Sequence, residues 1–348
     1  MYLSILLTLF LLLSYFVRFY PRQICKSSSL RISIYTPDEF KYKNDCLHPC
    51  VRYIEGGFVN NKWWLVQTPY YMRNSLLENP LLYCSDEKNF PLNWKFSSIV
   101  KDTPAIGFNS DPTIFYENNK LWVFWREYQT ENCKEVNADI VTFGSYTIDG
   151  YNFSQSRPFL INIGTDEDKE QSPILIKRNG KYQFYTVDYR YFPQKGCNGI
   201  AIWEGDCLEQ PNFIYKYTLK FSSVYTCDKY KQLKLFGTYL FIPKPLLNEL
   251  WHFDLIEYNG LLLILWVSEW GDNIMLSYSF DYEKFNHLTL PLINSHVSQQ
   301  FYLYKPTGSV VDNELCFYYT AVSKQSVNCN ELFMNKIPLS KLGIYKVS

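Results

Sequence analysis

The sequence predicts an all-β protein, a five-bladed β-propeller with four-stranded antiparallel blades. One hairpin pattern occurs five times, and each copy has β-branched and aromatic residues on both sides of a short polar turn. Aromatic residues make up 18% of the chain and hydrophobic residues 47%, a composition that favours strands around a sizeable core. The copies are also regularly spaced, which leaves room in each unit for two further strands.

The clearest copy of the hairpin runs from Ser110 to Glu127, where a turn at Glu117–Asn119 joins two apolar strands. In the first unit, residues Asn79 to Trp94 read as two further short strands, which completes the four strands of a propeller blade. Units that cannot bury both faces alone are expected to stack radially into a closed ring. The other four copies begin at His48, Ser172, His252 and Phe301.

The spacing of the copies locates an insertion. Pro49, Pro112 and Pro173 mark equivalent blade starts and are 63 and 61 residues apart, whereas the matching Phe253 follows Pro173 by 80 residues. The third unit must therefore contain extra residues. We expect them between Tyr215 and Glu249, where lysines, apolar residues and two prolines are mixed.

The N-terminal segment differs from the rest of the chain, because Met1 to Val17 contain no charged side chain. This length lies between the apolar core of a signal peptide and a membrane span of roughly 20 residues. We therefore predict an apolar helix within residues 1–25 that acts as a signal or membrane anchor. A linker over residues 26–47 and the propeller over residues 48–348 follow.

Basic residues follow the apolar run at Arg18, Arg22 and Lys26, with no acidic residue nearby. By the positive-inside rule, an uncleaved anchor would leave the propeller on the cytoplasmic side. A buried apolar segment that covers the propeller is the alternative. The sequence thus predicts a protein that is membrane-associated through its N-terminal segment or secreted, and it leaves the side of the membrane open.

Charge and cysteine content exclude several functions. Thirty-four basic residues balance thirty-four acidic ones, so nucleic acid is not an expected partner. The ten cysteines include no CxxC pair, and the four histidines are distant in sequence from paired thiols, so we predict no metal site and no cofactor. Local disulfides and free buried thiols remain alternatives for Cys46 with Cys50, Cys197 with Cys207, and Cys316 with Cys329.

The blade starts, together with the NPLLYCSD and NW motifs of the first blade, resemble the five-bladed propellers of glycoside hydrolases related to arabinanases, xylosidases and invertases (families 43 and 32). They are more similar still to propellers of this kind found beside surface-polysaccharide and phage genes. The resemblance covers about Leu47 to Ser323. It implies a carbohydrate-active protein that binds an oligosaccharide or polysaccharide in its central funnel.

In those hydrolases each of the first three blades places one carboxylate at the rim of the funnel: a general base, an aspartate that tunes pKa values, and a general acid. Asp111, before Pro112, matches the second-blade aspartate. His48 occupies the position of the base, and Gln171 that of the acid. The resemblance therefore implies a degenerate triad. The candidate catalytic residues are Asp111, His48 and Asp254, the last because it faces the same side of its blade as His252.

Other polar and aromatic residues at the blade starts and strand ends are candidates for substrate binding. Because side chains alternate along a strand, residues two apart face the same side of a blade. Carboxylates and an arginine suit sugar hydroxyls or an acidic sugar, and aromatic rings can stack on sugar faces. The candidates are Arg126, Glu127, Ser172, Asp188, Trp251, His252, Glu269 and Tyr302.

Two functions remain open on this basis. The first is an enzyme that binds a glycan in the funnel and cleaves it with altered machinery. The second is a non-catalytic protein that binds glycans or takes part in the assembly of a surface polysaccharide. Two carboxyl groups that face each other at roughly 5 to 10 Å would distinguish a hydrolase from a binding protein. Asp111 could also serve only to bond backbone amides at the strand entry.

Overall fold

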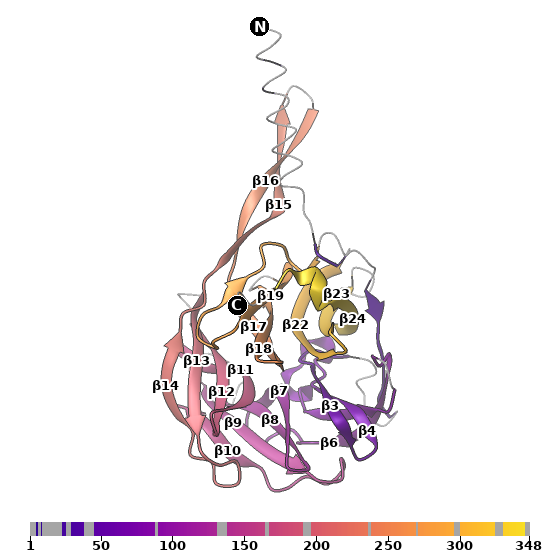
Figure 1. Ribbon diagram of the computed structural model, residues 1–348, viewed down its shortest axis with the longest axis vertical. Helices are drawn as coiled ribbons and strands as arrows, with labels where there is room; N and C mark the ends of the chain where they lie inside the picture. Colours follow the sequence, from indigo (N-terminus) through magenta and orange to yellow (C-terminus); the bar gives the residue numbers. More distant parts are fainter. Residues whose placement is uncertain are drawn as a thin grey trace.

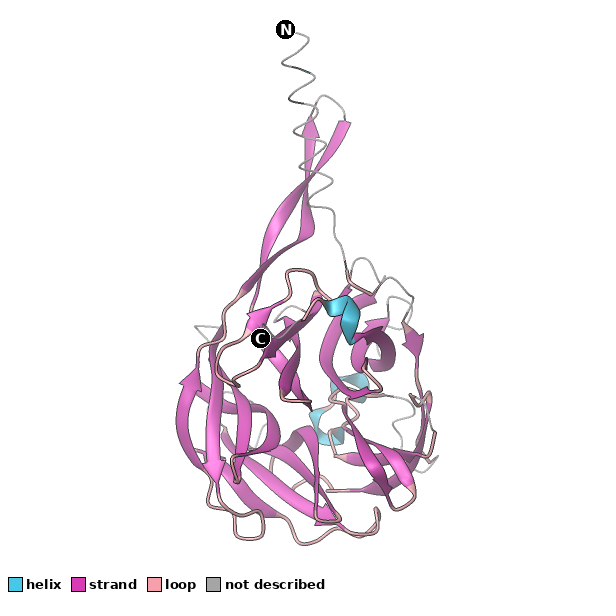
Figure 2. Cartoon of the chain, in the orientation of Figure 1, coloured by secondary structure: helices cyan, strands magenta, loops and turns pink. Residues whose placement is uncertain are grey.

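The structure is a computed structural model, and over the part of the chain it describes the strands form five sheets around a common centre, with one separate hairpin (Figure 1). Strands account for nearly all the regular structure (Figure 2). The prediction of an all-β, five-bladed propeller is thereby confirmed. The described residues are 5, 8, 23–25, 29–37, 45–87, 90–130, 138–163, 167–190, 196–235, 238–268, 271–295, 300–323 and 330–344.

Each of the first three blades is a meander whose first strand lies nearest the centre. Blade 1 contains β3 (Cys50–Phe58), β4 (Asn61–Gln67), β5 (Leu81–Ser85) and β6 (Asn93–Ile99). Blade 2 contains β7 (Phe108–Glu117), β8 (Lys120–Gln129), β9 (Asp139–Thr147) and β10 (Arg157–Asn162). Blade 3 contains β11 (Glu167–Arg178), β12 (Lys181–Arg190), β13 (Gly196–Gly205) and β14 (Ile214–Leu219).

The last two blades follow the same order with small departures. Blade 4 contains β17 (Leu250–Tyr258), β18 (Leu261–Ser268) and β19 (Asn273–Ser279), and its outer edge is shared by β20 (Asn286–His287) and β21 (Ile293–Asn294). Blade 5 contains β22 (Gln300–Val311), β23 (Glu314–Ser323) and β24 (Asn330–Pro338). Its fourth strand comes from the other end of the chain.

The N-terminal strands close the ring. β1 (Leu30–Arg31) pairs with β24 and completes blade 5, while β2 (Ser33–Tyr35) runs parallel to β6 at the edge of blade 1. β1 and β2, which lie in the stretch that the sequence predicted as a linker, therefore tie the first blade to the last. Strands of two and three residues are too short to show an alternating pattern, so they could not be predicted from the sequence.

The five inner hairpins turn in the same way, through two consecutive residues with positive φ. Such two-residue turns match the right-handed twist of the flanking strands, and they favour Asn, Asp and Gly. This explains why the repeated hairpin could be recognised from its polar turn. The turn residues are Val59–Asn60, Asn118–Asn119, Asn179–Gly180, Asn259–Gly260 and Asp312–Asn313.

One apolar cluster fills each gap between neighbouring blades. Trp63 and Trp64 show how a single strand serves two of these gaps, because successive side chains point to opposite faces. Trp63 packs in the cluster shared with blade 5, and Trp64 in the cluster shared with blade 2. Burial of both faces of every blade is the main force that closes the ring.

The predicted insertion is a hairpin of two long strands, β15 (Val224–Leu235) and β16 (Thr238–Asn248), between blades 3 and 4. The predicted N-terminal apolar helix falls mostly on residues outside the described ranges. Within those ranges, no helix is long and apolar enough to span a membrane. Three short 3-10 helices are described, η1 (Tyr71–Arg73), η2 (Ser75–Leu77) and η3 (Leu339–Leu342).

The described cysteines favour the free-thiol alternative. Cys50, Cys207 and Cys316, one member of each local pair considered above, are not bridged. Cys329, the second member of the last pair, lies outside the described residues. Cys50 is buried between blades 1 and 2, where its Sγ lies 3.5 Å from Thr113 Oγ1.

Candidate functional site

The inner strands of blades 2 to 5 all begin with an irregular step in their pairing with the next strand. In blades 2 and 3 this step places Asp111 and Ser172 in the left-handed region, with φ of 47° and 52°. A bulge re-aims a side chain that would otherwise follow the strand. Here it brings residues from different blades together at one end of the central axis.

Asp111 is the centre of this group and is fully buried. Arg126 Nη2 lies 2.8 Å from its Oδ2, and Lys305 Nζ lies 3.5 Å from its Oδ1. The backbone N–H of Ser172 donates to Oδ2 at 3.3 Å. Burial alone would raise the pKa of Asp111, but the surrounding basic side chains outweigh it and hold the pKa well below its usual range. The carboxylate is therefore ionised and a poor general base.

Two histidines complete what we call the His–Asp cluster, defined as His48, Asp111 and His252. His48 Nε2 and His252 Nδ1 each lie 3.4 Å from Asp111 Oδ1. Both rings are buried, which lowers the pKa of His48 to about 3 and that of His252 well below its ordinary value. Both imidazoles are neutral at physiological pH.

Each ring also has other polar neighbours, which contact the outer Nδ1 of His48 and, on His252, the same Nδ1 that faces Asp111. His48 Nδ1 lies 3.0 Å from Thr68 Oγ1 and 3.3 Å from Glu78 Oε2. His252 Nδ1 lies 2.7 Å from Ser172 Oγ. These contacts fix the orientation of both rings, as partners of metal-binding and catalytic histidines commonly do.

Tyr304 is a member of the site that the sequence analysis missed. Its hydroxyl lies 2.9 Å from His252 Nε2 and 3.3 Å from His48 Nε2, so it connects the two histidines. The sequence had pointed to Tyr302, two residues earlier. Tyr302 instead lies beside Tyr304 and Trp251, with ring centroids 5.8 and 6.1 Å away, and forms with them a half-buried aromatic wall next to the cluster.

Lys305 was also missed, although the sequence contained a signal for it. His48, Asp111 and Ser172 each precede a proline at the start of a blade, and Lys305 precedes Pro306 in the same way. If the start of the fifth blade had been assigned from the dipeptide Lys305-Pro306 rather than from Phe301, Lys305 would have been predicted to lie near Asp111.

Several predicted site residues lie away from the His–Asp cluster. Asp188 accepts hydrogen bonds from Asn198 Nδ2 at 3.1 Å and Thr218 Oγ1 at 2.8 Å, both within blade 3. Glu127 follows Arg126 in β8 and so faces the opposite side of the strand, where burial raises its pKa. Glu269 lies outside the described residues.

Asp254 is not placed as a catalytic base. Its two oxygens accept from Arg52 Nη2 and Nη1 at 2.6 and 2.7 Å, and Oδ2 also accepts from Thr307 Oγ1 at 2.6 Å. This axial ion pair, Arg52–Asp254, joins blades 1 and 4 across the centre of the ring. The carboxylate is buried and fully engaged, so its role is structural.

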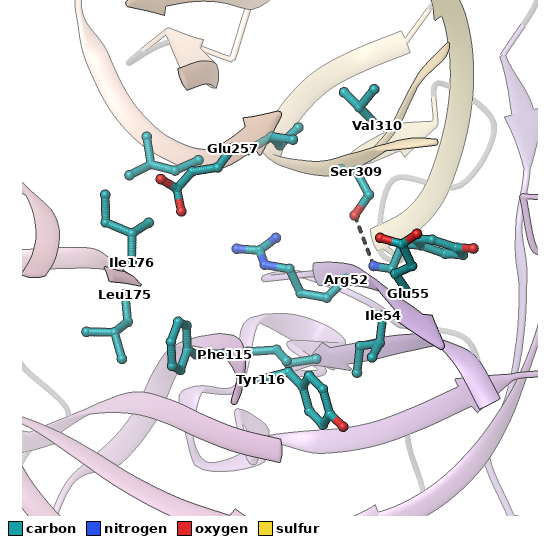
Figure 3. A pocket seen from close by; sticks show the side chains of 15 residues that line it. Arg52, Ile54, Glu55, Phe115, Tyr116, Leu175, Ile176, Glu257, Ser309 and Val310 are labelled. Atoms are coloured by element: carbon teal, nitrogen blue, oxygen red, sulfur yellow. Dashed lines mark hydrogen bonds between the residues drawn. The ribbon is translucent and has the colours of Figure 1, made fainter. Parts of the chain in front are cut away.

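A cavity of about 310 Å³ lies on the other side of the axial ion pair. Figure 3 shows Arg52 pointing into it, with Phe115 and Ile176 on its apolar wall and the Glu257 carboxylate facing the guanidinium. Its lining residues come three to seven positions after the residue that precedes the proline, or its equivalent, at each blade start. The cavity and the His–Asp cluster are therefore separate regions along the axis.

Among the described contacts of Asp111 there is no second carboxylate. Gln171 stands at the acid position, with Nε2 3.4 Å from His252 Nε2. Glu170 is buried and accepts from Thr142 Oγ1 of blade 2 at 2.9 Å. Glu78 lies beyond the imidazole of His48 as seen from Asp111, so a side chain fills the space that a glycosidic bond would need.

The His–Asp cluster could instead hold a metal ion, contrary to the expectation from sequence. Its three residues each offer one ligand atom, and these atoms lie within 4.8 Å of one another. Neutral imidazoles and an ionised carboxylate are the protonation states that a divalent ion requires. The Glu78 and Thr68 contacts on the outer side of His48 match the support that ligating histidines usually have. The residues present therefore fit such an ion.

Comparison with known proteins gives the fold but no closer relative: no protein-family model and no curated protein sequence matches the chain. Among solved structures, an N-acetylgalactosamine deacetylase from F. plautii, in complex with blood group B trisaccharide, is similar with a TM-score of 0.67 and 12% identity over 91% of this chain and 96% of that one. The chain shares its fold.

Two glycoside hydrolases are similar at lower scores. Zg3597, a family 117 enzyme produced by Zobellia galactanivorans, has a TM-score of 0.56 and 11% identity over 93% of this chain and 94% of its own. The GH43_1 enzyme from Xanthomonas citri has a TM-score of 0.55 and 8% identity over 88% and 89%. The resemblance to five-bladed propellers of glycoside hydrolases is thus confirmed for the fold.

The buried histidines make stability depend on pH. Because the pKa of each is lower in the folded state than the ordinary value of about 6.5, the unfolded chain binds more protons below that pH. For metal-free protein we expect the free energy of unfolding to fall by about 1.4 kcal/mol per pH unit and per histidine as the pH decreases from about 6.5. Urea denaturation with a chelator, from about pH 7 to pH 5, measures this. A constant free energy over that range would contradict it.

Proposed function

We propose that this chain binds a glycan beside the His–Asp cluster and hydrolyses an acyl group from one of its sugars, with a divalent ion held by His48, Asp111 and His252. The observation that carries the proposal is the placement of these three ligand atoms within 4.8 Å, with both imidazoles neutral. The similarity to an N-acetylgalactosamine deacetylase supports the reaction class. The aromatic wall supports a sugar as the ligand.

A bound divalent ion would polarise a carbonyl oxygen and make a water molecule more acidic. Tyr304 can donate a hydrogen bond from a hydroxyl that lies between the two histidines. Arg126 and Lys305 keep Asp111 ionised. Trp251 and Tyr302, half-buried beside the cluster, are positioned to stack on a sugar ring and orient its acyl group.

A second candidate, a non-catalytic glycan-binding protein, is favoured by one observation. Arg126 and Lys305 already neutralise Asp111, so the group can be stable without any further cation. The funnel would then serve as a binding site, including a site for an acceptor in polysaccharide assembly. Hydrolysis of the glycosidic bond itself fits less well, because the space around Asp111 contains no facing carboxylate among the described contacts.

Acetate release separates these candidates. Purified full-length protein, treated with a chelator and then supplied with Zn²⁺, Mn²⁺ or Ca²⁺, is incubated with a panel of N- and O-acetylated oligosaccharides. We expect metal-dependent release of acetate, and a loss of about 10- to 100-fold in kcat for Tyr304→Phe, which removes a hydroxyl that contacts two proposed ligands. Tyr302→Phe is the matched control, since its ring is part of the wall but its hydroxyl has no described contact with the histidines.

The same protein is titrated with the metals by calorimetry, which gives a readout independent of activity. His252→Gln is expected to weaken binding of the metal. Glycan binding without metal binding and without acetate release would replace the proposal by the non-catalytic alternative. The appearance of new reducing ends in place of acetate would restore glycoside hydrolysis.

A further inference from the structure

The hairpin between blades 3 and 4 is unlike every other part of the propeller. Its strands β15 and β16, 12 and 11 residues long, pair with each other and with no other described strand. Figure 1 shows the hairpin extending well beyond the ring of blades. We call it the ribbon. A two-stranded ribbon alone in water is marginally stable, so one of this length is expected to lie against another surface.

The sequence of the ribbon indicates the chemistry of that surface. Between Lys229 and Asn248 there are four lysines and no acidic residue, in a chain whose total charge is balanced. The remaining residues of this stretch are mostly apolar or aromatic. A segment that combines lysines with tyrosine, phenylalanine and leucine is suited to the boundary between anionic headgroups and acyl chains.

The register places these two kinds of residue side by side toward the turn. Lys234 pairs with Tyr239, and Lys231 pairs with Ile242. Leu233, between the two lysines, pairs with Leu240. The distal half of the ribbon is therefore both apolar and cationic, whereas its base at Val224 and Asn248 belongs to the body of the propeller.

The base of the ribbon is linked by hydrogen bonds to Gln23, near the end of the N-terminal segment. Asn273 Nδ2 donates to Asn248 Oδ1 at 2.9 Å, and Asn294 Nδ2 donates to Asn273 Oδ1 at 3.0 Å. The backbone N–H of Asn294 then donates to Gln23 Oε1 at 3.0 Å. All three asparagines are fully buried. The base of the ribbon and the described residues 23–25 thus lie at one corner of blade 4.

We propose that the ribbon binds the surface of a lipid bilayer that contains anionic headgroups. The net positive charge of the stretch from Lys229 to Asn248 would be attracted to the headgroups, and its apolar composition suits the interface. Such a contact, made by a hairpin that extends from the propeller between blades 3 and 4, would orient the propeller relative to the bilayer. This inference is independent of the function proposed for the His–Asp cluster.

Hydrogen exchange of the full-length protein in lipid nanodiscs tests the proposal. Discs of phosphatidylcholine alone are compared with discs that also contain phosphatidylglycerol. Amides of residues 224–248 are expected to exchange about tenfold more slowly in the anionic discs, and this protection should decrease at high salt. Peptides from β8 serve as an internal reference, because the core of blade 2 should exchange alike in both.

A variant with Lys229, Lys231, Lys234 and Lys244 replaced by Gln should lose the added protection. Its matched control replaces four exposed lysines of the blades by Gln, namely Lys62, Lys216, Lys284 and Lys341, and should keep it. Equal exchange in both kinds of disc would overturn the proposal. So would protection that is present without lipid and disappears when residues in 1–17 are made polar, since the N-terminal segment itself would then cover the ribbon.

Discussion

Replacing Asp254 by alanine is expected to destabilise the propeller by about 3–5 kcal/mol. The change removes the only carboxylate that contacts Arg52 in the described structure, and it leaves the guanidinium in a low-dielectric site with 18% of its side chain exposed. It also removes the acceptor for Thr307 Oγ1. Urea denaturation of the variant and of the parent protein measures the loss as a lower midpoint.

Two controls identify the cause of that loss. Asp206→Ala removes an ion pair with Lys181 in which both partners are largely exposed, and it should cost less than about 1 kcal/mol. The double variant Arg52→Met with Asp254→Leu removes both charges, and it should recover most of the stability because no charge remains buried. A loss in the double variant as large as in Asp254→Ala would show that the shape of the side chains, and not their charge, supports the axis.

The fold was predictable because the hairpin that identifies each blade is short in sequence and occurs five times. Each inner hairpin carries its own turn residues, and five copies of a weak signal make a strong one. The pairing that closes the ring was not predictable, because it joins short segments that are far apart in sequence. β1 and β2 have only two and three residues and depend on partners that lie far along the chain. Their pairing is a property of the closed ring.

Part of the residue group around Asp111 could be recognised from the residue that precedes a proline at the start of a blade. His48, Asp111 and Ser172 each precede a proline at a blade start, and the structure brings the three together. Asp254 shares a strand face with His252, two residues away, yet it lies one step deeper along the axis, where Arg52 reaches it. Alternation gives the face on which a side chain lies but not its depth, so sequence alone could not separate a site residue from a structural one.

The irregular pairing at the starts of β7 and β11 explains why residues at the blade starts, and not those at the strand ends, lie in the His–Asp cluster or contact it. The left-handed conformation costs a residue other than glycine about 1–2 kcal/mol, so Asp111 and Ser172 are held in it by the surrounding structure. Ser172 donates its backbone N–H to Asp111 and places its hydroxyl on His252. The strained backbone of two blades is thus directly coupled to the ligand geometry of the His–Asp cluster.

Asp111→Asn tests this coupling, and its expected effect on stability is as large as that of Asp254→Ala. The amide keeps the shape of the side chain but removes the charge that compensates Arg126 and Lys305, which are 3% and 0% exposed. Leaving these two cations uncompensated should destabilise the fold by about 3–5 kcal/mol, and it should remove metal binding.

A second substitution separates the two consequences of Asp111→Asn. Adding Lys305→Met to it removes one of the uncompensated charges, so stability should recover in part, while metal binding should stay absent because the carboxylate ligand is still missing. Denaturation and calorimetry on the same preparations measure both. If Asp111→Asn were as stable as the parent and still bound the metal, the carboxylate would be neither the counter-ion of the funnel nor a ligand, and the function proposed for the His–Asp cluster would fail with it.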